Sequence, residues 1–269
     1  TYDRLPVCLF KDIEGKTICL LFSVSCHPSM IGGFSISAEY PGVATRLLDE
    51  KLGTIASMFL QGVGGDAKPR IIGKGEDRWS PGTWEMMEET GRTIAREVGQ
   101  ALENGLHQIQ PALIYAAVEM EWPLQKIPPR GDFEAIASKP KPAGVSDYVQ
   151  WLWAKRQIEL LDRHGRLPTS AHLSLHGIQI GHGLRLVGIE GEAVAEWGMN
   201  IESFFGTGVT FPLGYTDGQG LYLPVSRMVD EGGYEAISAW EYGYPAPLAK
   251  GMEEQVAKGL NELRQRGIE

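Results

Sequence analysis

The sequence is poor in cysteine and in positive charge, and each shortage excludes a class of protein. Three cysteines occur in 269 residues and none forms a CxxC pair, which argues against a structural zinc cluster. Lysine and arginine number 25 against 34 aspartates and glutamates, which gives a formal charge of -9, and they form no run. Because nucleic acids are bound by clustered basic side chains, we expect no nucleic-acid partner.

Long apolar runs are also missing. No stretch approaches the roughly 20 residues that a helix needs to cross a bilayer, so we expect no transmembrane segment. The first six residues, TYDRLP, lack the charged and then apolar pattern of a signal peptide. The few cysteines favour a reducing compartment such as the cytoplasm.

The pattern of apolar residues predicts an α/β fold with mixed β-sheets flanked by helices. A turn at 12–15 joins strands 5–10 and 16–26 into a hairpin, which places Phe10 opposite Cys19 and Cys8 opposite Leu21. The two cysteines are then not directly opposed, and we expect no bridge between them. Helix 41–52 and strand 55–60 follow, which completes a β-loop-α-β pattern.

The rest of the chain continues in the same way. The predicted elements are helix 83–103, strand 113–120, helix 146–163, a second hairpin of 171–180 and 184–189, helix 192–205, strand 209–215 and helix 248–263. Prolines and lysines between 122 and 144 predict a long connection, either a surface excursion or a lid. Without an internal repeat or a break in composition, residues 1–269 are expected to form a single domain.

Polar side chains follow the apolar strands at the points where those strands end. His27 stands in Cys-His-Pro-Ser at 26–29, Glu39 in Ser-Ala-Glu-Tyr-Pro-Gly at 37–42, and Asp66 and Lys68 in the glycine-rich stretch 61–69. Strand ends of this kind are where α/β enzymes build their sites. Each residue also has a purely structural interpretation: a hydrogen-bonded histidine, an aspartate that caps a turn, and a solvated lysine paired with that aspartate.

Three further blocks follow along the chain: Gly-Glu at 191–192, DGQGLYLP at 217–224 and EGGYE at 231–235. Together with the blocks around His27, Glu39 and Asp66, they resemble the neutral ceramidase family and occur in that family's order. The likeness is nearer to bacterial ceramidase-like hydrolases than to true ceramidases. It implies a catalytic domain that binds one zinc ion through two histidines, a glutamate and a tyrosine, with His27, Glu192 and Tyr222 matching three of them. Such ligands leave room for a water of lowered pKa. The structural alternatives are a charge at a helix N-terminus for Glu192 and a half-buried strand residue for Tyr222.

The sequence departs from this family pattern in three places. The family's first zinc histidine lies upstream of the His-Pro block, and no histidine precedes His27 here. We expect the chain to be part of a longer protein; the alternatives are that another segment or chain supplies the ligand, or that the site no longer binds metal. His176 and His182 are not expected to substitute, because one lies in a strand and the other in a turn. Lys68 stands where true ceramidases carry their proposed catalytic serine, and Glu39 replaces an aspartate.

The resemblance and these departures lead to one functional expectation. The sequence predicts a zinc-dependent hydrolase that cleaves an amide or ester bond of a small molecule or lipid amide through a zinc-activated water. Asp66 would assist proton transfer, Lys68 would orient the substrate, and Glu39 would line the site. The alternatives are a metal-independent acid/base enzyme for a small polar or sugar-like substrate, and a binding domain without catalysis.

Overall fold

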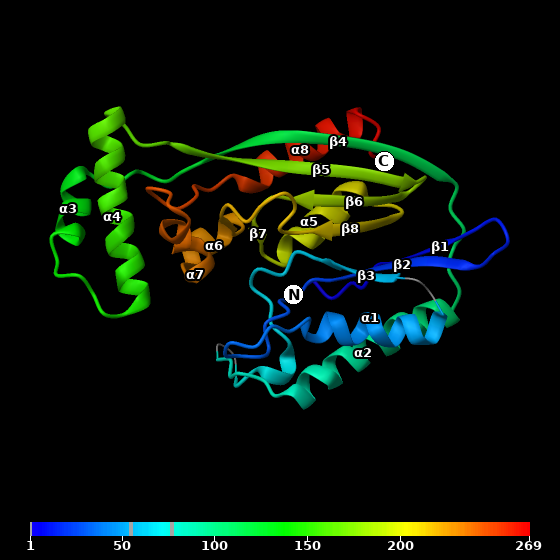
Figure 1. Ribbon diagram of the computed structural model, residues 1–269. Helices are drawn as coiled ribbons and strands as arrows, with labels where there is room; N and C mark the ends of the chain where they lie inside the picture. The colour runs from blue at the N-terminus through cyan, green and yellow to red at the C-terminus, as the bar shows by residue number, and fades with distance from the viewer. Residues whose placement is uncertain (1, 54–55, 76–77) are drawn as a thin grey trace.

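The computed structural model describes residues 2–53, 56–75 and 78–269, and it has the predicted α/β architecture of mixed sheets flanked by helices (Figure 1). The first sheet has the order β1 (Val7–Lys11), β2 (Thr17–Val24), β3 (Ala56–Gln61). The β1–β2 hairpin is antiparallel and pairs Phe10 with Cys19 and Cys8 with Leu21, which confirms the predicted register. All three cysteines are free. Strand β3 runs parallel to β2, as a β-loop-α-β unit requires; residue 55 of the predicted strand lies outside the described residues.

Two helices pack together beside this sheet. Helix α1 (Glu39–Leu52) connects β2 to β3 and ends at Gly53 in the left-handed conformation, and α2 (Trp84–Glu103) begins after Thr83, whose side chain accepts a hydrogen bond from the Met86 nitrogen. Their contact is close, because a Cβ placed on Gly91 would lie 2.4 Å from Cβ of Val43. A short helix, η1 (Arg70–Ile72), lies between β3 and α2.

The second sheet has the order β4 (Pro111–Pro123), β5 (Ser170–Gly181), β6 (Leu184–Ile189), β8 (Val209–Leu213). The β5–β6 hairpin is confirmed, and strand β8 ends at 213, two residues earlier than predicted. Helices α5 (Glu196–Phe205) and α8 (Met252–Gln265) pack on this sheet and on each other. The core between them includes Trp122 and Trp197, which are fully buried and meet edge to face. Among the described residues, no helix has the length and apolarity that spanning a bilayer would require.

The connection predicted between 122 and 144 contains a helix that the sequence reasoning missed. Helix α3 (Arg130–Ala137) packs against α4 (Val145–His164) as a pair at the far end of the long strands β4 and β5 (Figure 1). Phe133 is fully buried there, with its ring against Trp153. One apolar anchor therefore allows this short, proline-flanked segment to form a helix.

The predicted helix 192–205 was also wrong at its start. Residues 192 and 193 form strand β7 (Glu192–Ala193), which pairs in parallel with β9 (Tyr222–Leu223), and the helix begins only at Glu196. The Glu192 nitrogen donates to the Leu221 carbonyl, so tertiary pairing overrides the local helical pattern. The fold is completed by α6 (Ser226–Glu231), α7 (Tyr234–Ile237) and η2 (Ser238–Tyr242); the last helix starts at 252 rather than 248.

Candidate active site

The first candidate residue, His27, reaches its place through the close packing of two loops. Its backbone nitrogen donates to the Ala67 carbonyl at 2.9 Å, which joins the segment after β2 to the glycine-rich segment after β3. A Cβ on Gly64 would lie 2.6 Å from the Cys26 nitrogen, and a Cβ on Gly65 would lie 2.8 Å from the Glu192 carbonyl oxygen. The two glycines therefore allow the loop to bring His27 against the β7–β9 ladder.

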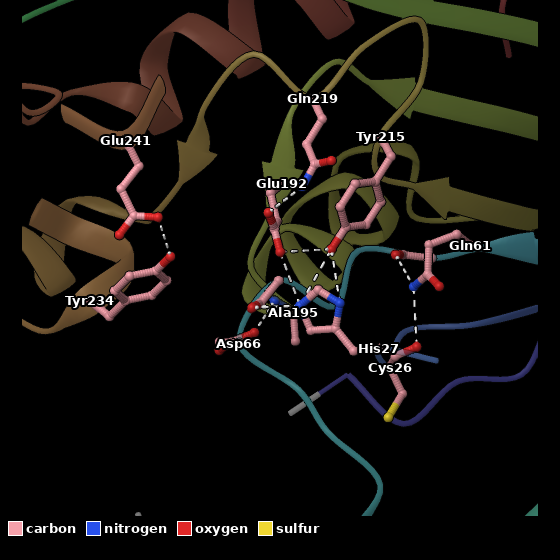
Figure 2. Close-up of polar contacts among 12 residues, drawn as sticks. Cys26, His27, Gln61, Asp66, Glu192, Ala195, Tyr215, Gln219, Tyr234 and Glu241 are labelled. Atoms are coloured by element: carbon pink, nitrogen blue, oxygen red, sulfur yellow. Dashed lines mark hydrogen bonds and ion pairs between the residues drawn. The ribbon is translucent and has the colours of Figure 1, made fainter. Parts of the chain in front are cut away.

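His27 and Glu192 form the centre of the site (Figure 2). The Nε2 atom of His27 lies 3.1 Å from Oε1 of Glu192 and 3.1 Å from the Gly65 carbonyl oxygen. Glu192 is 4% exposed. A carboxylate this deeply buried requires partners, because an unpaired charge inside a fold is strongly unfavourable.

Other side chains supply those partners. Oε2 of Glu192 accepts hydrogen bonds from the Gln219 amide at 2.8 Å and from the Tyr242 hydroxyl at 3.0 Å, and Oε1 accepts one from the Tyr215 hydroxyl at 3.3 Å. Burial by itself would raise the pKa of Glu192, but hydrogen bonds from neighbours, first of all His27, outweigh this effect and lower the pKa to about 2. Glu192 is therefore an anion at neutral pH.

Tyr222 reaches the same carboxylate from the neighbouring strand. It is the direct register partner of Glu192 in the β7–β9 ladder, and its hydroxyl interacts with the Glu192 carboxylate. Burial raises the pKa of Tyr222, and the hydrogen bond to Glu192 raises it further. Its ring meets Tyr234 and Tyr242 edge to face. The structure thus brings together His27, Glu192 and Tyr222, the three residues that the sequence predicted as metal ligands.

The residues predicted to act in catalysis are spread more widely. Asp66 is exposed and lies beside the pair, where its Oδ1 accepts a hydrogen bond from the Ala195 nitrogen at 2.7 Å, just before helix α5 (Figure 2). Lys68 is exposed, and within the part of the chain that the structure describes it forms no ion pair, with Asp66 or with any other residue. Their catalytic roles remain predictions.

Glu39 lies apart from this network. It is 9% exposed and begins helix α1 with φ of 53°, a conformation that residues other than glycine seldom adopt. One oxygen, Oε1, accepts a hydrogen bond from the Ile31 nitrogen at 2.8 Å, and Oε2 is buried with no hydrogen-bond partner in the described part of the chain. Among the described residues, none of the hydrogen bonds of Glu39 connects it to His27 or Glu192.

The two histidines that were not expected to act as ligands also lie elsewhere. His176 is on β5, where its Nδ1 lies 3.1 Å from the Tyr115 hydroxyl, and His182 is in the turn between β5 and β6. No contact within the described ranges joins either of them to His27.

Three residues of the site were missed: Gln219, Tyr242 and Tyr215. Gln219 stands inside the block at 217–224 that supported the family resemblance, so its position was available as a signal. Tyr242 comes from the short helix η2, and Tyr215 has φ of 57°. No local pattern predicts such contacts, because they depend on how distant segments pack.

The donor atoms fit a zinc ion in part. Zinc binds imidazole nitrogen and carboxylate oxygen at about 2.0–2.2 Å, and two ligands on one tetrahedral ion lie about 3.3 Å apart. The separation of 3.1 Å between Nε2 of His27 and Oε1 of Glu192 agrees with that spacing. Within the described residues, no group of three or more histidine, cysteine, aspartate or glutamate side chains could hold a metal, so a complete site needs tyrosine oxygens or a ligand from elsewhere.

With the geometry established, comparison with known proteins identifies the class of fold. No protein-family model and no curated protein sequence matches the chain. Two solved structures are similar to it, each with a TM-score of 0.64 and 13% identity: the neutral ceramidase from Pseudomonas aeruginosa, over 97% of this chain and 46% of that one, and a ceramidase complexed with C2, over 98% and 48%. The chain spans about half the length of these structures. It has a ceramidase-like α/β fold, and at this identity the likeness shows the fold alone.

Proposed function

We propose that this chain carries most of the active site of a zinc-dependent, ceramidase-like hydrolase that cleaves an amide or ester bond. The observation that carries the proposal is the contact of 3.1 Å between the half-buried His27 and the buried Glu192, with the Tyr222 hydroxyl on the same carboxylate. Nitrogen, carboxylate and phenol together form a donor set suited to zinc. When bound, zinc would polarise the scissile carbonyl and lower the pKa of a water molecule.

The protein's own residues divide the remaining work. Gln219 and Tyr242 hold the Glu192 carboxylate in one orientation, as supporting hydrogen bonds do around metal ligands. Asp66, at the edge of the site, accepts a proton from the attacking water and returns it to the leaving group. Lys68, as a cation, orients the substrate, and its presence in place of a serine leaves water as the nucleophile.

The substrate class follows from the chemistry and the fold. The structures that share the fold are ceramidases, which favours a lipid amide. A smaller amide or an ester is compatible with the same chemistry. The metal-free alternative has less support, because no contact among the described residues joins Glu39, Asp66 and Lys68 into one acid/base group.

Metal analysis and turnover together test the proposal. Purified protein that is loaded with zinc and then dialysed against metal-free buffer should retain one zinc ion per chain. It should also hydrolyse members of a panel of fluorogenic N-acyl amides and esters. His27→Ala should lose both properties, whereas His182→Ala, which changes a histidine in a distant turn, should keep them. Full activity of the complete protein without zinc, or in the presence of a chelator, would refute the metal mechanism.

A further inference from the structure

The proposed hydrolysis places negative charge on the carbonyl oxygen of the scissile bond. Enzymes stabilise such charge with hydrogen-bond donors that are fixed before the reaction, and removal of one donor typically lowers kcat by about 100-fold to 1000-fold. A donor with this role must lie beside the catalytic centre and must be able to change its acceptor. In this site it belongs to the groups around His27 and Glu192.

Two backbone nitrogens of the glycine-rich loop are already bonded within the fold. The Gly65 nitrogen donates to the Ala193 carbonyl at 2.8 Å, and the Ala67 nitrogen donates to the Gly64 carbonyl at 3.0 Å. Neither nitrogen can turn to a substrate oxygen without leaving a backbone carbonyl of the fold without its donor. The side chains that surround the pair are therefore the better source.

Among those side chains, Tyr215 makes a longer hydrogen bond to Glu192 than Gln219 and Tyr242 do. Gln219 and Tyr242 lie 2.8 Å and 3.0 Å from Oε2. The Tyr215 hydroxyl lies 3.3 Å from Oε1, which exceeds the usual separation of about 2.5–3.0 Å between two hydrogen-bonded oxygens. Of these three donors, Tyr215 is the one that a stronger acceptor can most easily attract.

The hydroxyl of Tyr215 faces both residues of the pair (Figure 2). Besides its contact with Glu192, it lies 3.4 Å and 3.5 Å from the two ring nitrogens of His27, and the two rings meet edge to face. Burial, together with the charge of Glu192, raises the pKa of Tyr215 above its ordinary value, so the phenol keeps its proton at neutral pH. A carbonyl oxygen that reaches this pair therefore meets a neutral donor.

The backbone fixes Tyr215 in a conformation that local energetics disfavour. Its φ of 57° is unusual for a bulky residue. Hydrogen bonds from the Tyr215 nitrogen to the Gly191 carbonyl and from the Thr216 nitrogen to the Ile189 carbonyl hold the segment against the loop that precedes Glu192. Strain of this kind persists where the surrounding structure imposes it, and it is concentrated at functional sites. The hydroxyl is thus positioned in advance, as charge stabilisation requires.

We propose that the Tyr215 hydroxyl donates a hydrogen bond to the carbonyl oxygen of the substrate as that oxygen gains negative charge, which makes Tyr215 a catalytic residue. The inference rests on the proposed function, since it names a further group of the same site. When the water oxygen adds to the carbonyl carbon, the π electron pair moves to the carbonyl oxygen, and Tyr215 shares its proton without losing it. When the pair returns, the bond to the leaving group breaks and the leaving group takes the proton held by Asp66.

Kinetics and the binding of a transition-state analogue test this role. A phosphonate analogue of the best substrate in the panel carries the charged tetrahedral group, and calorimetry measures its affinity. With saturating zinc, Tyr215→Phe should lower kcat by about 100-fold, keep KM within about threefold and bind the phosphonate at least about tenfold more weakly, while it retains one zinc ion per chain. The matched control is Tyr115→Phe, which removes a hydroxyl that contacts His176 on β5; it should leave all four quantities unchanged.

A second variant keeps the test valid if the phenylalanine variant does not fold. Replacing Tyr215 with 4-aminophenylalanine preserves the size of the ring substituent and supplies an N–H donor, so kcat should stay within about tenfold of the wild type. A loss of about 100-fold in this variant would overturn the role of a donor.

Tyr242→Phe provides a contrast, because Tyr242 holds the Glu192 carboxylate from its other oxygen; this variant should weaken zinc binding by about tenfold. Tyr215→Phe could weaken zinc binding in the same way and yet, once saturated with zinc, bind the phosphonate as the wild type does. Tyr215 would then be a positioning residue, and the inference would be overturned.

The failure of this inference is distinguishable from the failure of the proposed function. If the wild type hydrolyses the panel with zinc, and Tyr215→Phe keeps both kcat and the affinity for the phosphonate, only the role of Tyr215 is wrong. If the wild type binds no zinc and cleaves no member of the panel, the proposed function is wrong, and the role of Tyr215 fails with it.

Discussion

Replacing Glu192 with glutamine should destabilise the protein in a manner that depends on pH. Glu192 is buried, and its pKa is lowered from 4.5 to about 2. A carboxylate with a lowered pKa stabilises the fold above its unfolded pKa, and this contribution is lost as the pH falls through the folded pKa. This difference in pKa corresponds to about 3 kcal/mol of folding stability at neutral pH. About 2 kcal/mol of that stability is lost between pH 6 and pH 3.

Urea unfolding monitored by tryptophan fluorescence measures this contribution directly. The wild type and Glu192→Gln are compared at pH 6 and at pH 3 in the presence of a chelator, so that metal binding adds nothing. The difference in unfolding free energy between them should shrink by about 2 kcal/mol as the pH falls. Glu254→Gln, which removes an exposed carboxylate on α8, controls for the loss of one charge. If the wild type exceeds Glu192→Gln in unfolding free energy by the same amount at both pH values, the lowered pKa of Glu192 is refuted.

Three further outcomes follow from contacts around the site and in the core. Asp66→Ala removes the carboxylate that accepts a hydrogen bond from the Ala195 nitrogen, just before α5, and should lower the unfolding free energy by about 1 kcal/mol. An unchanged urea midpoint would show that this hydrogen bond contributes nothing to stability. Gly91→Ala should destabilise by about 1–3 kcal/mol despite the better helix propensity of alanine, because its Cβ would meet Val43 at 2.4 Å, and a raised melting temperature would contradict this. Burial raises the pKa of Cys26 to about 12, so iodoacetamide at mildly alkaline pH should modify it at least about 100-fold more slowly than free cysteine; peptide mass mapping would reveal faster labelling.

The parts of the fold that the sequence predicted well are those specified by neighbouring residues. The turn before Gly15 determined the β1–β2 register, and Gly53 marked the end of α1. Helix α2 was predicted from its periodic apolar residues, and the structure shows that Thr83, predicted as its first residue, caps it instead. Local chemistry alone decides such features, so reading along the chain recovers them.

The failures arise where distant segments compete with local preference. Residues 192 and 193 look helical, but pairing with 222 and 223 holds them in a strand. The contact between Tyr215 and His27 joins positions 188 residues apart through a backbone conformation that no pattern indicates for tyrosine. The resemblance supplied His27, Glu192 and Tyr222, whereas the supporting residues around them required the packed structure.

The two-residue ladder of β7 and β9 determines how this site can vary. Glu192 and Tyr222 are paired in register on adjacent strands. The backbone hydrogen bonds of the ladder therefore set the distance between these two residues. The loop after β8 is a separate constraint, because its residues Tyr215 and Gln219 donate hydrogen bonds to the Glu192 carboxylate. A slip by a single residue would turn one of the two side chains to the opposite face. Insertions should therefore be harmful within the two strands and in the loop that carries Tyr215 and Gln219, so the ladder and this loop vary as one unit.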